Sequence, residues 1–65
     1  MYDAFKQLMK FRDHIINAGH IFDYDFVKNA LDEKNLLDLD LVNFLAQKDV
    51  ADYEKLQLVR KLVSK

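Results

Sequence analysis

The chain has 65 residues, a net charge of −1 and a hydrophobic fraction of 51%, and it contains neither Cys nor Pro. The length allows one domain, and the composition is typical of a folded domain rather than of a disordered segment. The lack of Cys excludes a disulfide framework, and no apolar run approaches the ~18 residues of a membrane span. We therefore expect a single helical domain over residues 1–65, located in the cytoplasm and without a membrane partner.

The charge is distributed unevenly along the chain. Residues 1–19 carry three cations against two acids (+1), residues 20–54 carry three cations against nine acids (−6), and residues 55–65 carry four cations (+4). An acidic middle segment repels a phosphate backbone, so the sequence disfavours nucleic-acid binding.

The first predicted helix covers about residues 2–17 and has the most regular pattern in the chain. With 3.6 residues per turn, its apolar residues fall on one half of the circumference and nearly all of its polar residues on the other. The apolar half contains Met1, Tyr2, Ala4, Phe5, Leu8, Met9, Phe11, Ile15 and Ile16. So wide an apolar surface needs cover from two sides, which its own chain, a second copy or a partner must provide.

Arg12 is the one charged residue inside that apolar half. One interpretation is that its aliphatic stem lies over apolar surface while the guanidinium reaches the rim. The other is an ion pair with an acid from residues 23–40 or from a second subunit, which would fix an orientation more than it adds stability.

The second predicted helix covers about residues 24–33. Gly19 should end the first helix, because the left-handed backbone of that position suits glycine. Asp23 is the expected N-cap of the second helix, because its carboxylate can accept from the free amides of the first turn. Asn35, which tolerates the left-handed conformation, should end it.

The third predicted helix covers about residues 39–47, with Asp38 as its N-cap. Apolar residues cover more than half of its circumference, so we expect it to be the most buried helix. These residues are Leu39, Leu41, Val42, Phe44, Leu45 and Ala46.

The fourth predicted helix covers about residues 50–63, with Asp49 as its N-cap. Its main apolar stripe is Tyr53, Leu56, Val59 and Val63, and Leu58 and Leu62 lie to one side of that stripe. The four segments together predict an all-α fold, a compact bundle of four helices with short loops.

The sequence offers little material for catalysis or metal binding. Cys and Thr are absent, and Ser64 is next to last, where it cannot be held against a base. His14 lies on the polar face of the first helix, where we expect it to be solvated. His20 with Asp23 or Asp25 would be the strongest metal set, but two His without Cys or an HExxH spacing make a poor zinc signature. We expect no enzyme activity, no catalytic residue, no cofactor and no metal.

The first function hypothesis is a small non-enzymatic protein-interaction module. It would act as a homodimer or other homo-oligomer, or as a regulator or inhibitor of bacterial or phage type that docks on a larger protein. Its predicted contact residues combine the apolar, aromatic and Arg side chains that dominate protein interfaces. They are Phe5, Met9, Arg12, Ile16, Tyr53, Leu58 and Leu62.

The alternative is a helix-turn-helix-like DNA-binding regulator. The helices predicted at 24–33 and 39–47 have suitable lengths, and the second would present Asp40, Asn43 and Gln47 to base edges. This surface has no Arg and is flanked by acids, so we place this hypothesis second.

Overall fold

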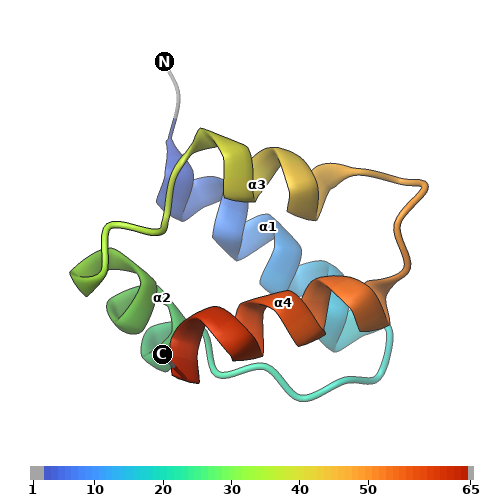
Figure 1. Cartoon of the computed structure of the whole chain (residues 1–65). Helices are drawn as coiled ribbons and strands as arrows, with labels where there is room; N and C mark the ends of the chain where they lie inside the picture. The colour runs from blue at the N-terminus through green and yellow to red at the C-terminus, as the bar shows by residue number, and fades with distance from the viewer. Residues whose placement is uncertain (1–2, 65) are drawn as a thin grey trace.

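The computed structural model describes residues 3–64 and shows four α-helices joined by short connections (Figure 1). They are α1 (Ala4–Asn17), α2 (Tyr24–Glu33), α3 (Leu39–Ala46) and α4 (Asp52–Ser64). α1 runs through the middle of the molecule, α2 and α3 pack on it, and α4 packs on α2. Residues 3–64 contain no strand, so the predicted all-α bundle is confirmed.

Aspartate side chains start the first three helices. Asp3, Asp23 and Asp38 have extended backbones, and each carboxylate accepts from the amide three residues later, at 3.1, 3.2 and 2.9 Å respectively. The caps predicted at Asp23 and Asp38 are confirmed. The predicted start of the first helix at residue 2 is wrong, because the non-helical Asp3 precedes Ala4. Residues 1 and 2, also assigned to its apolar half, lie outside the described residues.

The first two helices end as predicted. Gly19 has a φ of 93°, and its amide donates to the carbonyl of Ile16. Asn35 has a φ of 56°, in the same left-handed region. Both positions suit residues for which this conformation carries little or no steric cost.

The boundaries around the last connection differ from the prediction. α3 ends at Ala46, one residue early, because Gln47 has an extended backbone. Asp49 lies in a turn and does not cap α4, so the predicted cap and start at residues 49 and 50 are wrong. The helical bonding begins at Ala51, whose carbonyl accepts from the amides of Glu54 and Lys55.

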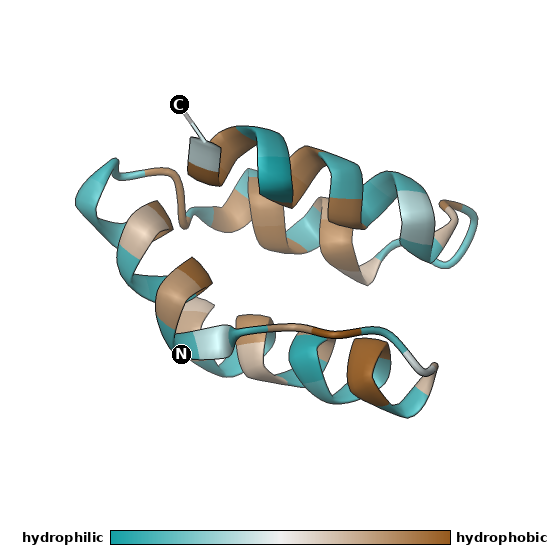
Figure 2. Ribbon diagram, turned by 90° about the horizontal axis from the view of Figure 1, so that it is seen from below, coloured by the Kyte–Doolittle hydropathy of each residue, from teal (hydrophilic) through white to brown (hydrophobic). Residues whose placement is uncertain are grey.

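The core lies where the apolar stripes of the helices meet (Figure 2). Phe11 of α1 also meets Phe22 edge to face, with ring centroids 5.7 Å apart. α3 has the largest buried share, three of its eight residues, although Leu39 at its start is exposed. The core cluster is Leu8, Phe11, Ile15, Val27, Leu31, Leu41, Leu45, Leu56 and Val59.

Two lysine side chains donate hydrogen bonds to backbone carbonyls at the C-terminal ends of helices. Lys34, directly after α2, donates from Nζ to the carbonyls of Leu62 and Val63 at 3.1 and 2.7 Å. The buried Lys55 of α4 donates to the carbonyl of Gln47, directly after α3. Carbonyls at helix C-termini lack partners within their own helix, so these ammonium groups supply them.

Candidate functional site

Four of the predicted contact residues form a line along α1. Phe5, Met9, Arg12 and Ile16 are separated by four, three and four residues, and we call them the outer stripe. The core residues of α1 form the neighbouring line. The exposed fractions of Phe5, Met9 and Ile16 are 43%, 41% and 49%, so a second molecule can reach the outer stripe. That it binds a partner stays a prediction.

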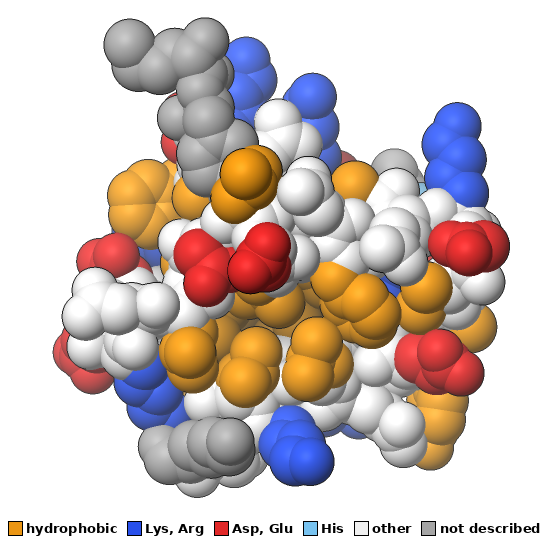
Figure 3. All heavy atoms as spheres, turned by 45° about the horizontal axis from the view of Figure 1, so that its top comes forward, with side chains coloured by type: hydrophobic (Ala, Val, Ile, Leu, Met, Phe, Trp, Pro, Cys, Tyr) orange, Lys and Arg blue, Asp and Glu red, His pale blue; other side chains and the backbone are white. Residues whose placement is uncertain are grey.

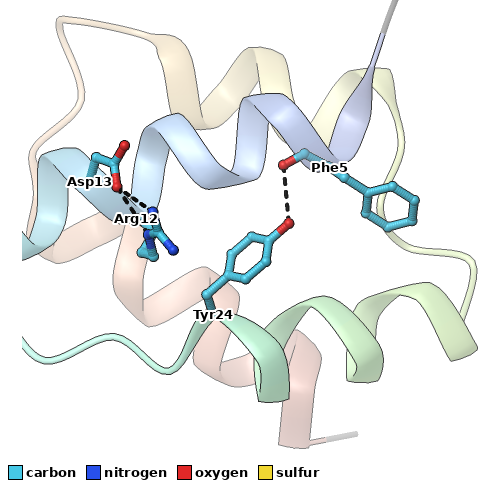
Figure 4. A network of polar contacts seen from close by, with 4 residues as sticks. All are labelled: Phe5, Arg12, Asp13 and Tyr24. Atoms are coloured by element: carbon cyan, nitrogen blue, oxygen red, sulfur yellow. Dashed lines mark hydrogen bonds and ion pairs between the residues drawn. The ribbon is translucent and has the colours of Figure 1, made fainter.

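Arg12 forms an ion pair with its neighbour in the sequence (Figure 4). Its Nη2 and Nε donate to Oδ1 of Asp13 at 2.7 and 3.0 Å, and its Cζ lies 5.4 Å from the centroid of the Tyr24 ring. The guanidinium is therefore at the rim, with its side chain 31% exposed, and its ion pair is with Asp13 rather than with an acid of residues 23–40 of the same chain. Asp13 reaches the guanidinium without any tertiary contact, whereas the acids of α2 and α3 would have to be brought to it.

The aromatic end of the outer stripe is tied to α2. Tyr24 donates from Oη to the carbonyl of Phe5 at 3.3 Å. The Nζ of Lys28 lies 5.7 Å from the centroid of the Phe5 ring and 5.9 Å from that of the Tyr24 ring. The Phe5 ring points away from Tyr24 and Arg12 (Figure 4), so α2 covers Phe5 only in part.

The predicted contact residues of α4 have different surroundings. Tyr53 is exposed, and its Oη accepts from Nε2 of Gln57 at 2.7 Å. Leu58 and Leu62 are half-buried and pack against the core. On the face that carries α3 and α4, hydrophobic side chains form a band between charged ones (Figure 3). Leu58 and Leu62 are therefore less exposed than Phe5, Met9 and Ile16, whereas Tyr53 is more exposed than these three.

A second apolar surface was not predicted. Ile21 and Phe26 have exposed fractions of 92% and 61%, and both line a hollow of about 230 Å³ between α2 and α4. We call this the α2–α4 hollow; its other apolar lining residues are Phe22, Val27, Leu56, Val59 and Val63. Ile21 lies in a connection, where no helical periodicity marks it, and Phe26 lies next to the buried Val27 in α2.

A larger cavity, of about 400 Å³, lies between α1, α3 and the start of α4. His14 is exposed, as predicted, but its Nε2 also lies 3.0 Å from Oδ1 of Asp52. This contact, which was not predicted, joins α1 to α4. Lys10, Lys48 and Lys55 also line this cavity. Because Asp52 pairs with His14 and Lys55 bonds the end of α3, these groups serve contacts between helices.

Within the described part of the chain, no three His, Asp or Glu side chains are grouped so that they could hold a metal ion. None of the four helices is both long enough and apolar enough to cross a membrane. Comparisons with protein-family models, curated proteins and solved structures found no match for this chain.

Proposed function

We propose that the chain is a small non-enzymatic protein-interaction module that docks on a larger protein through the α2–α4 hollow. The observation that carries this proposal is the pair of exposed side chains, Ile21 and Phe26, beside a hollow of about 230 Å³. Its lining is mostly apolar and also includes Asp23, Arg60 and Ser64. Single exposed apolar residues are common on proteins, but a contiguous apolar patch around a depression is typical of a binding surface.

The size and lining of the hollow define the partner that it fits. An apolar cavity of about 150 Å³ is enough to hold a benzene ring, so the hollow has room for one bulky apolar side chain. Val27, Leu56 and Val59 line it from the core side and are themselves buried. The favoured partner is a protein segment that presents a Phe, Leu or Met side chain and covers Ile21 and Phe26 around it.

The chemistry of the chain supports the non-enzymatic part of the proposal. Ser64 is the only Ser or Thr, and its hydroxyl donates to the carbonyl of Arg60 at 2.8 Å, within the last turn of α4. A serine nucleophile needs a base within hydrogen-bond reach, whereas this one is engaged by its own helix. The cytoplasmic location and the bacterial or phage regulatory role belong to the same proposal.

DNA binding by a helix-turn-helix stays a prediction, because no observation on this structure tests it. α3 exposes Asp40 and Asn43, and Gln47 follows it, but its eight residues include neither Lys nor Arg. Because phosphate contacts supply most of the affinity for DNA, we place this function behind protein docking.

Site-specific photocrosslinking in the cells that express the chain tests the proposal. A benzophenone side chain at position 26 should give adducts with a larger protein, and the same group at position 32 should not. Asp32 is the matched control, because it is exposed on the same helix but does not line the hollow.

The variant Ile21→Lys, combined with the crosslinker at position 26, should lose the adduct while its circular dichroism stays unchanged. Equal adducts from positions 26 and 32, no adduct from position 26, or adducts only with the chain itself would each overturn docking on a larger protein through the hollow.

A further inference from the structure

The outer stripe has the spacing of a helix that pairs with another helix. Steps of four, three and four residues from Phe5 through Met9 and Arg12 to Ile16 match the a and d positions of a heptad repeat. α1 has 14 residues, which gives a length of about 21 Å. The stripe therefore runs along almost the whole helix as one narrow seam.

This seam is symmetric about its own centre. If a second α1 lies antiparallel on the first, Phe5 faces Ile16 of the second copy and Met9 faces Arg12 of the second copy. Each of the four side chains then meets an apolar partner or the stem of Arg12. A two-fold axis that passes between Met9 and Arg12 generates all four layers, as a closed dimer requires.

The charges beside the seam agree with the same alignment. Lys6 and Asp13 both follow a d position, are both exposed, and are one heptad apart with opposite signs. In the antiparallel pairing Lys6 of one copy and Asp13 of the other are offset by two residues, about 3 Å along the helix axis, which their side chains can bridge. This ion pair occurs twice in a dimer. Flanking charges of this kind set the orientation and choice of partner in paired helices.

Parallel pairing fails on the same residues. It would place Arg12 of one copy directly against Arg12 of the other inside the seam, where like charges repel. In the antiparallel alignment Arg12 instead packs against Met9, and its guanidinium keeps Asp13, at 2.7 Å, as a partner at the edge. Only the antiparallel arrangement satisfies the seam and its flanks together.

We infer that the outer stripe of α1 is the interface of an antiparallel two-fold dimer, with a second copy of this chain as its occupant. One seam of this length lies at or below the ~1,200 Å² end of specific interfaces, so the dimer is weak and its population depends on concentration. The stripe belongs to α1, whereas the hollow lies between α2 and α4, so either proposal can fail without the other.

Charge reversal tests the alignment, with analytical ultracentrifugation of the purified chain over a concentration series as the readout. Lys6→Asp or Asp13→Lys alone turns two attractive contacts per dimer into two repulsive ones, and each should weaken dimerisation about tenfold. The double variant Lys6→Asp/Asp13→Lys restores both pairs between the copies, although Arg12 lacks its Asp13 partner, and should dimerise at least about threefold more tightly than either single variant. Lys10→Asp, which alters the net charge as Lys6→Asp does but lies on the polar side of α1, should change the affinity less than about twofold.

The decisive arm mixes the two single variants in equal amounts. In the mixed dimer the introduced aspartate of one copy faces the introduced lysine of the other, and the remaining Lys6 faces the remaining Asp13. Native mass spectrometry should therefore show the mixed dimer as the main dimeric species. Met9→Lys should abolish dimerisation with unchanged circular dichroism.

Three outcomes would overturn the inference. The first is a chain that stays monomeric up to about 1 mM, the range of the weakest associations. The second is a mixture of the single variants without preference for the mixed dimer. The third is a Lys10→Asp variant that dimerises as weakly as Lys6→Asp.

Discussion

α1 and α4 have similar apolar patterns but different surroundings. In both sequences a core stripe lies beside a second line of apolar residues. On α4 the second line, Leu58 and Leu62, is half-buried against the core, whereas on α1 the second line remains exposed at Phe5, Met9 and Ile16. A wide apolar half therefore shows how much surface a helix has to cover, but not whether its own chain covers it.

The difference follows from where the neighbouring helices lie. α2 and α3 pack on α1 and bury its core stripe, and Tyr24 and Lys28 of α2 contact the outer stripe. α4 is held by α2, by Lys34 at its C-terminal end and by His14 at its start.

The largest expected effect separates the two lines of α1. Ile15 is fully buried, so Ile15→Ala should lower the free energy of unfolding by about 3 kcal/mol through lost burial and a cavity. Ile16→Ala, one residue later on the outer stripe, should cost less than about 1 kcal/mol at concentrations where the chain is monomeric. Urea unfolding measures both, and equal losses would show that the outer stripe is covered within the chain.

A smaller effect is expected for the second line of α4. Leu62→Ala should cost about 1–2 kcal/mol, because the side chain is half-buried against the core. Tyr53 is exposed, so Tyr53→Ala should change the free energy of unfolding by less than about 0.5 kcal/mol. Thermal unfolding of both variants measures the difference. If both variants lose equally little stability, Leu62 is as open to solvent as the outer stripe, and the contrast between α1 and α4 disappears.

The attachment of α4 gives the third prediction. Lys34→Met removes the ammonium that bonds the carbonyls of Leu62 and Val63, and we expect a loss of about 1–1.5 kcal/mol. Lys61→Met, in the last turn of α4 and exposed, is the control and should change stability by less than about 0.5 kcal/mol. Amide hydrogen exchange at the end of α4 should also become faster in Lys34→Met but not in Lys61→Met. Identical exchange in the two variants would show that the hydrogen bonds of Lys34 do not hold the end of α4.

The smallest effects compare the start of α3 with the start of α4. Asp38→Ala should cost about 1 kcal/mol, because the carboxylate accepts from the amide of Leu41 at 2.9 Å. Asp49→Ala should stay within about 0.5 kcal/mol, because Asp49 lies in the turn before α4 and does not cap it. A loss at Asp49 equal to that at Asp38 would restore the boundary expected from the sequence.

The sequence by itself determined the helices and most of their ends, because the signals are local. Periodicity defines each helix within its own residues, Asp23 and Asp38 cap amides three residues away, and Gly19 and Asn35 need only their own backbone angles. The start of α4 was misplaced because Asp49 has the chemistry of a cap, whereas the helical bonding begins two residues later, at the carbonyl of Ala51. The side chain of Ala51 cannot cap a helix, so no local signal marks this start.

Tertiary structure decided which apolar surface stays open and how the helices are joined. The contact of His14 with Asp52 spans 38 residues and that of Lys34 with Val63 spans 29, so no local pattern could predict either. The α2–α4 hollow exists only because α4 packs on α2 beside the exposed Phe26. A helical-wheel projection of the sequence shows which apolar residues share a face of a helix. Which of them are exposed to solvent depends on the positions of the neighbouring helices.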